Sequence, residues 1–176
     1  MKAVRALLVS LALCSMVVAQ DAGKIFVVRH AEKVSEADDA FLSAKGKTRA
    51  ECLAQTLRDA GITTILVTNF ERTRQTAEPL INQTHAKTAT FDSKAYDQIA
   101  AAANTAARSG NVLVVGHSNT IPTLMTTFHT PKVTIASDAY DQLFFFTADK
   151  PSQLTTLHFC PNLPKDTQSP NSMAKP

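Results

Sequence analysis

The sequence predicts an α/β fold in the form of a three-layer sandwich. Two apolar runs, at 25–28 and 112–115, are rich in β-branched residues and show no polar alternation, which is typical of strands covered on both faces of a parallel sheet. Segments with helical periodicity separate the runs, so that strands and helices alternate. We therefore expect a mostly parallel central sheet with helices on both faces, and an antiparallel strand pair near the C-terminus.

The N-terminal segment predicts a secretory signal peptide. Lys2 and Arg5 precede an apolar stretch at 6–18 that is too short to span a bilayer with margin, and Ala19 suits cleavage after it. Residues 1–19 would then be removed, which predicts an exported protein, either periplasmic or secreted.

The three cysteines agree with export but do not define a metal site. Cys14 lies in the predicted signal peptide, and the bulky Leu13 before it argues against a lipid anchor. Cys52 and Cys160 would remain in an oxidising compartment, where they could pair if the fold brings them together. Two isolated cysteines without close-set histidines do not predict a bound metal ion.

Composition predicts one domain at 20–160 and a disordered tail at 161–176, which is rich in Pro, Asn, Ser and Lys. Of the 18 basic residues, loss of Lys2 and Arg5 with the signal leaves 16 against 15 acidic ones. This near balance predicts no nucleic-acid partner and no general attraction to membranes, and we expect no transmembrane segment after cleavage. The oligomeric state stays open.

The first helix is predicted after a polar loop. Ser43 is positioned to cap it, and Gly61 predicts its C-terminal stop. Its apolar face, at spacings of three, four and seven, consists of Ala50, Leu53, Ala54 and Leu57. A second strand, dense in β-branched residues, follows at 63–67.

The second helix begins where this strand ends and carries two arginines, Arg72 and Arg74. Thr68 or Asn69 can cap it, and its amino end favours an anion. Pro79 predicts an end or a kink, because proline removes a backbone donor and crowds the preceding turn.

The remaining elements continue the alternation until the last two strands, which the turn at 149–151 separates. They are, in order, a strand at 88–91, a helix at 95–108, a strand at 111–115, a helix with Ile121, Leu124, Met125 and Phe128 on one face, a loop at 129–139, and strands at 142–147 and 153–159.

Four cationic or cationisable residues fall just past predicted strand ends: Arg29, His30, Arg72 and His117. Because the carboxyl ends of parallel strands meet at one edge of a sheet, we expect these side chains to share one cleft. Together they would repel one another unless a bound anion or paired carboxylates relieve the repulsion. The pattern therefore predicts phosphoryl chemistry.

The same residues resemble a known family, the histidine phosphatase superfamily with its phosphoglycerate-mutase-like fold. The similarity extends over roughly residues 24–159. It is carried by Arg29-His30-Ala31-Glu32, which resembles the Arg-His-Gly-Glu signature, by Leu42-Ser43 with Gly46 and Arg49-Ala50, by Arg72-Thr73-Arg74-Gln75-Thr76-Ala77, which resembles the Arg-Ala-x-Gln-Thr-Ala segment, and by Val115-Gly116-His117-Ser118, which is similar to the second-histidine motif.

The resemblance implies a metal-independent phosphatase without a cofactor. His30 would be the nucleophile that becomes phosphorylated, with Arg29, Arg72 and His117 holding the phosphoryl oxygens as two guanidiniums and an imidazolium. His30 must be neutral to attack, so its other ring nitrogen needs an acceptor, for which we expect a backbone carbonyl. Arg74 matches a variable position and is left out of the site. The expected substrate is a phosphomonoester or phosphohistidine, as a small molecule or a phosphoprotein.

The proton donor for the leaving oxygen departs from the family's commoner pattern. A glutamate usually supplies this proton from the segment after the third strand, where this chain offers only Asp92 and Asp97. Asp92 directly follows the strand and is the candidate, although it could equally cap the next turn. Family members that act on phosphohistidine can lack such an acid. Ala31 in place of the motif glycine, and Lys33 after Glu32, predict a pocket rim that differs from the usual one.

Three other readings compete with this assignment. Ser118 followed downstream by His158 resembles the nucleophile elbow of a serine hydrolase, although Thr120 stands where a glycine belongs. The cationic cleft could also bind a phosphorylated ligand without turning it over. A metal hydrolase built on His30, Glu32 and His117 is a weaker alternative, and Glu32 could instead be a rim carboxylate or a partner for Arg29.

Overall fold

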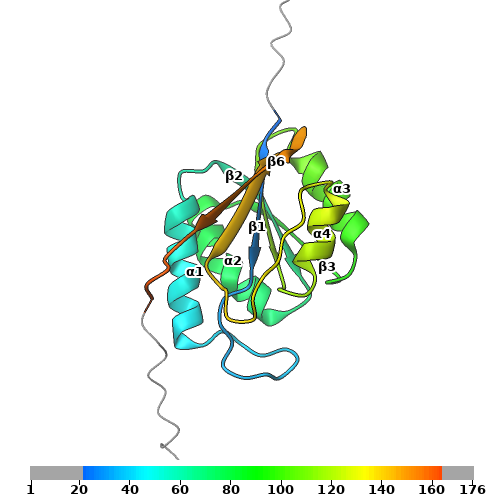
Figure 1. Cartoon of the computed structure of the whole chain (residues 1–176). Helices are drawn as coiled ribbons and strands as arrows, with labels where there is room; N and C mark the ends of the chain where they lie inside the picture. The colour runs from blue at the N-terminus through cyan, green and yellow to red at the C-terminus, as the bar shows by residue number, and fades with distance from the viewer. Residues whose placement is uncertain (1–21, 164–176) are drawn as a thin grey trace, which may run out of the picture.

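The computed structural model describes residues 22–163, which fold around one six-stranded sheet with the strand order β3-β2-β4-β1-β5-β6. Figure 1 shows the sheet between two pairs of helices. The elements are β1 (Lys24–Arg29), α1 (Ala44–Leu57), β2 (Ile62–Thr68), α2 (Glu71–Thr84), β3 (Lys87–Phe91), α3 (Tyr96–Ala106), β4 (Asn111–Gly116), α4 (Ile121–Thr127), β5 (Gln142–Thr147) and β6 (Lys150–His158). The expected signal peptide, and the expected tail from residue 164 onward, lie outside the described residues.

The predicted three-layer sandwich is confirmed. Strands β1 to β4 are parallel, and β5 and β6 form the antiparallel pair. Successive residues of β1 face opposite layers: Ile25 and Val27 pack with α3 and α4, whereas Phe26 and Val28 pack with α1 and α2. This double burial explains why β1 shows no polar alternation in the sequence. The parallel strands bring their carboxyl ends to one edge of the sheet.

The N-terminus of α1 is held against residues 29–32, called the signature segment below. Ser43 caps the helix as predicted, because its side chain accepts a hydrogen bond from the Gly46 N–H at 3.1 Å. Gly46 lies so close to Glu32 that a Cβ would stand 2.2 Å from the Glu32 carbonyl oxygen. The predicted stop is displaced: α1 ends at Leu57, and Gly61, with a φ of +62°, forms the turn into β2.

The expected cap of α2 and the expected end at Pro79 were wrong. Neither Thr68 nor Asn69 caps the helix: Phe70 occupies the N-cap position without a side-chain hydrogen bond. The carboxylate of Asp39, in the loop between β1 and α1, accepts a hydrogen bond from the Glu71 N–H at 2.7 Å instead. The helix does not end at Pro79 but continues to Thr84, and the alternative of a kink at Pro79 stays a prediction. A long-range contact therefore replaced the local cap, and the remaining backbone hydrogen bonds carry the helix past the proline.

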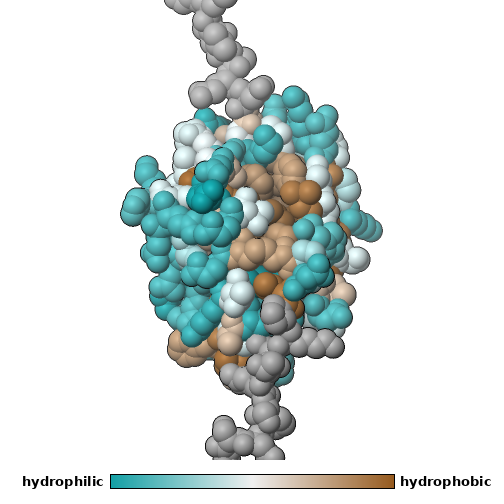
Figure 2. Space-filling model, turned by 90° about the vertical axis from the view of Figure 1, so that its left-hand side faces the viewer, coloured by the Kyte–Doolittle hydropathy of each residue, from teal (hydrophilic) through white to brown (hydrophobic). Residues whose placement is uncertain are grey.

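At the far edge of the sheet, β6 begins earlier than predicted and includes Pro151. An edge strand tolerates proline because one side of its backbone has no neighbouring strand. Beside it, a groove of about 410 Å³ between α1, β5 and β6 has an apolar lining that includes Phe26, Phe145 and Leu157. Figure 2 views this side of the molecule and shows apolar surface between hydrophilic areas. None of the described helices is both long enough and apolar enough to cross a bilayer.

A disulfide joins α1 to the segment after β6. Cys52 and Cys160, 108 residues apart in sequence, are bonded, with their Cα atoms 6.6 Å apart. The pairing that the sequence left open is therefore present in the fold. A bridge that closes so long a loop strongly restricts the unfolded chain.

We expect reduction of this disulfide to lower the free energy of unfolding by about 4 kcal/mol, because the unfolded chain regains the entropy of a long open loop. Urea unfolding of the wild type with and without dithiothreitol measures the effect. The double variant Cys52→Ser/Cys160→Ser should resemble the reduced protein and show no response to dithiothreitol. Equal midpoints for the oxidised and reduced wild type would contradict the prediction.

Candidate active site

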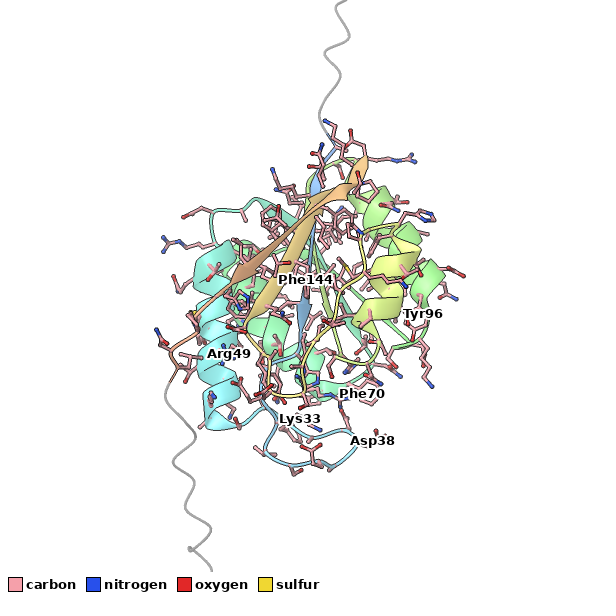
Figure 3. The ribbon with its side chains drawn as sticks, viewed as in Figure 1. Lys33, Asp38, Arg49, Phe70, Tyr96 and Phe144 are labelled. Carbon is pink, nitrogen blue, oxygen red and sulfur yellow. A yellow bond between two sulfur atoms is a disulfide. The ribbon has the colours of Figure 1, made fainter. Side chains whose placement is uncertain are left out.

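The four residues predicted to converge do so at the carboxyl edge of the sheet. Arg29 ends β1 and His30 follows it, Arg72 lies in the first turn of α2, and His117 follows β4. Figure 3 shows this edge, with Lys33, Phe70 and Asp38 gathered beyond the arrowhead of β1. The cleft there has a volume of about 300 Å³. Its lining consists of Arg29, His30, Lys33, Glu36, Arg72, His117, Ser118, Asn119, Ser137 and Tyr140.

His30 is held as a neutral imidazole. Its Nδ1 lies 2.8 Å from the carbonyl oxygen of Ala31, and because a carbonyl only accepts, Nδ1 must carry the proton. The side chain is 4% exposed, and burial lowers the pKa of His30 to about 3. The hydrogen bond to Ala31 opposes this shift, whereas His117, Arg72 and Arg29 add to it. The Nε2 lone pair is therefore free at neutral pH, and the expected backbone acceptor is present.

His117 lies beside His30, with 5.2 Å between the ring centroids. Its Nε2 is 2.8 Å from the hydroxyl of Thr68, which also contacts the hydroxyl of Thr73 at 3.1 Å. Burial, followed by the charges of Arg72, Arg29 and Lys33, lowers the pKa of His117 to about 4. The expected imidazolium is therefore a neutral imidazole at pH 7 in the free protein, and only a nearby negative charge would raise its pKa.

Arg29 is fixed by the loop that precedes β5. Its Nη1 donates to the carbonyl oxygens of Ala136, Ser137 and Ala139 at 3.1, 2.9 and 3.1 Å. The guanidinium carbon lies 3.8 Å from the centre of the Tyr140 ring. Burial lowers the pKa of Arg29, although nearby Tyr140 and carboxylates oppose the shift. A guanidinium stays charged at neutral pH, so the loop holds a buried cation in one orientation.

Arg72 is fixed by different partners. Its guanidinium carbon lies 4.2 Å from the centre of the Phe70 ring, and its Nη1 donates to the Asp38 carbonyl oxygen. Burial lowers its pKa, against the opposing charges of Asp39 and Asp38. Within residues 22–163, the buried Nε of Arg72, Nε of Arg29 and Nδ1 of His117 have no hydrogen-bond partner. Buried polar atoms are normally paired, and the three residues that carry these nitrogens all line the cleft, which is compatible with an anion-binding site there.

Glu32 forms its hydrogen bonds with Arg49 rather than with Arg29. Arg49 donates to its carboxylate from Nε at 2.9 and 3.0 Å and from Nη2 at 2.8 Å, and Lys45 lies 3.4 Å away. Burial raises the pKa of Glu32, but the hydrogen bonds and charges, chiefly of Arg49, bring it below its usual value. Glu32 is not a rim carboxylate, since it is outside the cleft lining, and its hydrogen-bonded partner is Arg49, although its charge also acts on Arg29. The pair instead ties the signature segment to α1.

We expect Glu32→Ala to lower the free energy of unfolding by about 3 to 5 kcal/mol, because it leaves the charge of Arg49 buried and unpaired. The side chains of Arg49 and Glu32 are only 7% and 10% exposed. Chemical denaturation of Arg74→Ala provides the control, since Arg74 is exposed and its ion pair with Glu71 should contribute less than about 1 kcal/mol. Similar losses in both variants would contradict the special role of the buried pair.

Asp92 is not among the residues that line the cleft. It is exposed, and its carboxylate accepts a hydrogen bond from the Lys94 N–H at 2.9 Å, so it caps the turn after β3. The turn-capping alternative therefore describes its observed contact, and its role as proton donor stays a prediction. Arg74, left out of the predicted site, is exposed and donates to the carboxylate of Glu71.

The serine hydrolase alternative lacks its catalytic pair. Ser118 follows β4, whereas His158 ends β6, three strands along the sheet order. Neighbouring strands are about 4.8 Å apart, so the two positions are separated by roughly 14 Å. His158 instead contacts the carboxylate of Asp141 at 3.0 Å.

The metal hydrolase alternative required Glu32 as a ligand, but the Glu32 carboxylate is paired with Arg49 and Lys45. No group of three or more His, Cys, Asp or Glu in the described part of the chain is placed to hold a metal ion.

Several residues that shape the cleft were not predicted. Thr68, which positions His117, carries a weak signal, since it is a polar residue at the end of an apolar strand. No sequence signal marks Tyr140 or the carbonyl groups at 136–139, because they lie in a loop more than 100 residues from Arg29 and reach it only in the folded chain. The sequence also gave no indication that the Phe70 ring would contact the Arg72 guanidinium.

The two buried histidines make stability depend on pH in a definite direction. Both have pKa values lowered from the ordinary value of 6.5, so the unfolded chain binds their protons first as the pH falls. Above pH 6.5 both histidines are neutral in the folded and the unfolded chain, and the free energy of unfolding does not depend on them. As the pH falls from 6.5 toward 4 and then 3, they lower the free energy of unfolding progressively. At pH 5 each histidine should already lower the free energy of unfolding by about 2 kcal/mol.

Urea unfolding between pH 7 and 5 tests this slope, in a range where most carboxylates titrate little. The double variant His30→Gln/His117→Gln should show a flatter dependence. An equally steep decline in the variant and the wild type would assign the pH effect to other groups.

Comparison with known proteins agrees with the resemblance seen in the sequence. The model of the histidine phosphatase superfamily (branch 1) matches residues 25–94. This region contains Arg29, His30 and Arg72, but not His117. No curated protein matches the chain.

Solved structures extend the similarity to nearly the whole described fold. SixA from Agrobacterium tumefaciens is 18% identical, with a TM-score of 0.56, over 77% of this chain and 96% of SixA. The protein histidine phosphatase SixA complexed with tungstate is 19% identical, with a TM-score of 0.59, and the match covers 77% of this chain and 95% of that one. The phosphoserine phosphatase of Entamoeba histolytica, in complex with 3-phosphoglyceric acid, is 15% identical, with a TM-score of 0.56, and the match covers 78% of this chain and 96% of that one. At these identities the structures confirm the fold.

Proposed function

From the chain's resemblance to the histidine phosphatase superfamily, we propose that it is a metal-independent phosphatase that acts through a phosphohistidine intermediate. The superfamily match and the phosphatase neighbours support the general class. The observation that carries the mechanism is the state of His30: Nδ1 is bonded to the Ala31 carbonyl, and burial keeps the ring neutral. A neutral nucleophile beside two guanidiniums is suited to attack a phosphoryl group.

In the proposed first step, His30 Nε2 attacks phosphorus in line with the leaving oxygen. The P–N bond forms as the P–O bond breaks, and the bonding electrons leave with the substrate oxygen. Arg29, Arg72 and His117 would hold the three equatorial oxygens, where charge is spread in the transition state. Water then attacks phosphorus, restores neutral His30 and releases phosphate.

The leaving group sets the demand for a proton. Glu36 is the carboxylate that lines the cleft, and Asp92 lies outside the lining. An aryl phosphate or a phosphohistidine has a leaving group that needs less assistance from an acid than an alkyl alkoxide does. We therefore propose phosphomonoesters with good leaving groups, or phosphohistidine, as the substrate class.

Export is part of the proposal and is supported by the disulfide. Stable structural disulfides are typical of oxidising compartments, and the Cys52–Cys160 bridge closes most of the domain. We propose a periplasmic or secreted location for the mature protein, which cell fractionation with an epitope-tagged chain would test.

Assays in the presence of EDTA test the function, using p-nitrophenyl phosphate, a panel of alkyl phosphates and a phosphohistidine peptide. We expect turnover of at least one substrate without added metal. Quenching during turnover should trap phosphate that is labile to acid and stable to base, and mass spectrometry should place it on His30. Binding without hydrolysis of the aryl ester would support the phospholigand-binding alternative. Covalent labelling of Ser118 by a fluorophosphonate would contradict the proposal.

A further inference from the structure

The cleft is also lined by a cationic side chain that the proposed phosphoryl transfer does not use, that of Lys33. Its side chain is only 16% exposed and lines the same cleft as His30 and Arg72. Its charge is close enough to His117 to contribute to the lowered pKa of that residue. Figure 3 places Lys33 beside the carboxyl end of β1, near Phe70 and Asp38.

The contacts of Lys33 differ from those of the two arginines. Arg29 and Arg72 are fixed by backbone carbonyls and aromatic rings. The ammonium of Lys33 contacts the carboxylate of Glu36 at 3.0 Å, and the Glu36 side chain is 96% exposed. An ion pair with so exposed a partner is weak, so another carboxylate can replace Glu36 at little cost. Lys33 is therefore a sheltered cation with an exchangeable partner.

The rest of the lining favours a polar ligand. Besides the histidines and arginines, it includes Ser118, Asn119 and Ser137, so an apolar leaving group would gain little from burial here. A volume of about 300 Å³ suits a small molecule. A second negative charge on that molecule would meet Lys33 where solvent screening is reduced.

We propose that Lys33 binds a second anionic group of the substrate, so that the preferred substrates are small phosphate monoesters whose leaving group carries a carboxylate or a similar anion. The inference rests on the proposed phosphatase function and names the substrate class of the same site. Lys33 is then a determinant of specificity, and Glu36 is the internal competitor that occupies it in the free protein.

Matched pairs of esters test the inference at two spacings: ethyl phosphate with phosphoglycolate, and phenyl phosphate with 4-carboxyphenyl phosphate. In at least one pair the wild type should show about tenfold higher kcat/KM for the carboxylated ester. Lys33→Met should remove this preference by slowing the carboxylated ester about tenfold more than its counterpart without the carboxylate. Glu36→Gln should have the opposite effect and raise kcat/KM several-fold for that ester, because the competitor has lost its charge. Lys87→Met, at the opposite edge of the sheet, should leave both members of the pair unchanged.

Binding to the His30→Ala protein separates this inference from the proposed function. Calorimetric titration with the same four esters measures the preference without turnover, in the presence and absence of Lys33→Met. Tighter binding of a carboxylated ester that depends on Lys33 supports the inference, even if the wild type hydrolyses nothing. Equal affinities within both pairs, or a preference that survives Lys33→Met, would overturn it, whatever the catalytic activity.

Discussion

Replacing His30 with alanine is expected to lower kcat for p-nitrophenyl phosphate at least about 1,000-fold. The substitution removes the Nε2 lone pair that forms the P–N bond, and water in its place lacks both the nucleophilicity and the alignment of the ring. Because an aryl leaving group hardly needs a proton, the loss reports on the nucleophile rather than on a missing acid. Steady-state rates in EDTA measure the effect, and the phosphate trapped on the wild type should be absent from the variant.

His158→Ala is the matched control for this experiment. His158 lies at the same edge of the sheet but contacts Asp141 and is outside the cleft lining. We expect its kcat to stay within about twofold of the wild type, as is usual for an exposed residue away from the site. Equal rates for His30→Ala and the wild type would remove the phosphohistidine mechanism. A large loss in His158→Ala would reopen the serine hydrolase alternative.

Arg72→Ala should lower kcat/KM about 1,000-fold, because a guanidinium that faces the equatorial oxygens stabilises charge that develops in the transition state. Arg72→Lys should recover only a small part of the loss. Lysine keeps the charge, but it cannot reproduce the planar contact with Phe70 or the fork of donors that also reaches the Asp38 carbonyl.

The neighbouring arginine gives a direct comparison. Arg74 is two residues further along α2, is exposed and pairs with Glu71, so Arg74→Ala should change kcat/KM by less than about twofold. Vanadate inhibition provides a second readout, since loss of Arg72 should weaken it and loss of Arg74 should not. If the two arginine variants behave alike, the phosphoryl group does not bind where we place it.

Much of the architecture follows from local patterns. The unbroken apolar runs of β1 and β4 predicted strands buried on both faces, and the periodicity of the segments between them predicted helices. Once strands and helices alternate, the carboxyl ends of the parallel strands must share an edge, so Arg29, His30 and His117 could be placed together from sequence alone. The errors occur where a distant group intervenes, as when Asp39 rather than Thr68 or Asn69 caps α2.

The sequence by itself determined the layers of this protein and which residues stand at the ends of its strands, because burial of apolar side chains leaves a period that can be read along the chain. Only the tertiary structure decided the partners of those residues: the loop that holds Arg29, the pairing of Glu32 with Arg49, and the exposed carboxylate beside Lys33. The physical reason is that a buried donor or charge must be satisfied by whatever groups the fold brings within about 3 Å, and sequence separation places no limit on which groups these are.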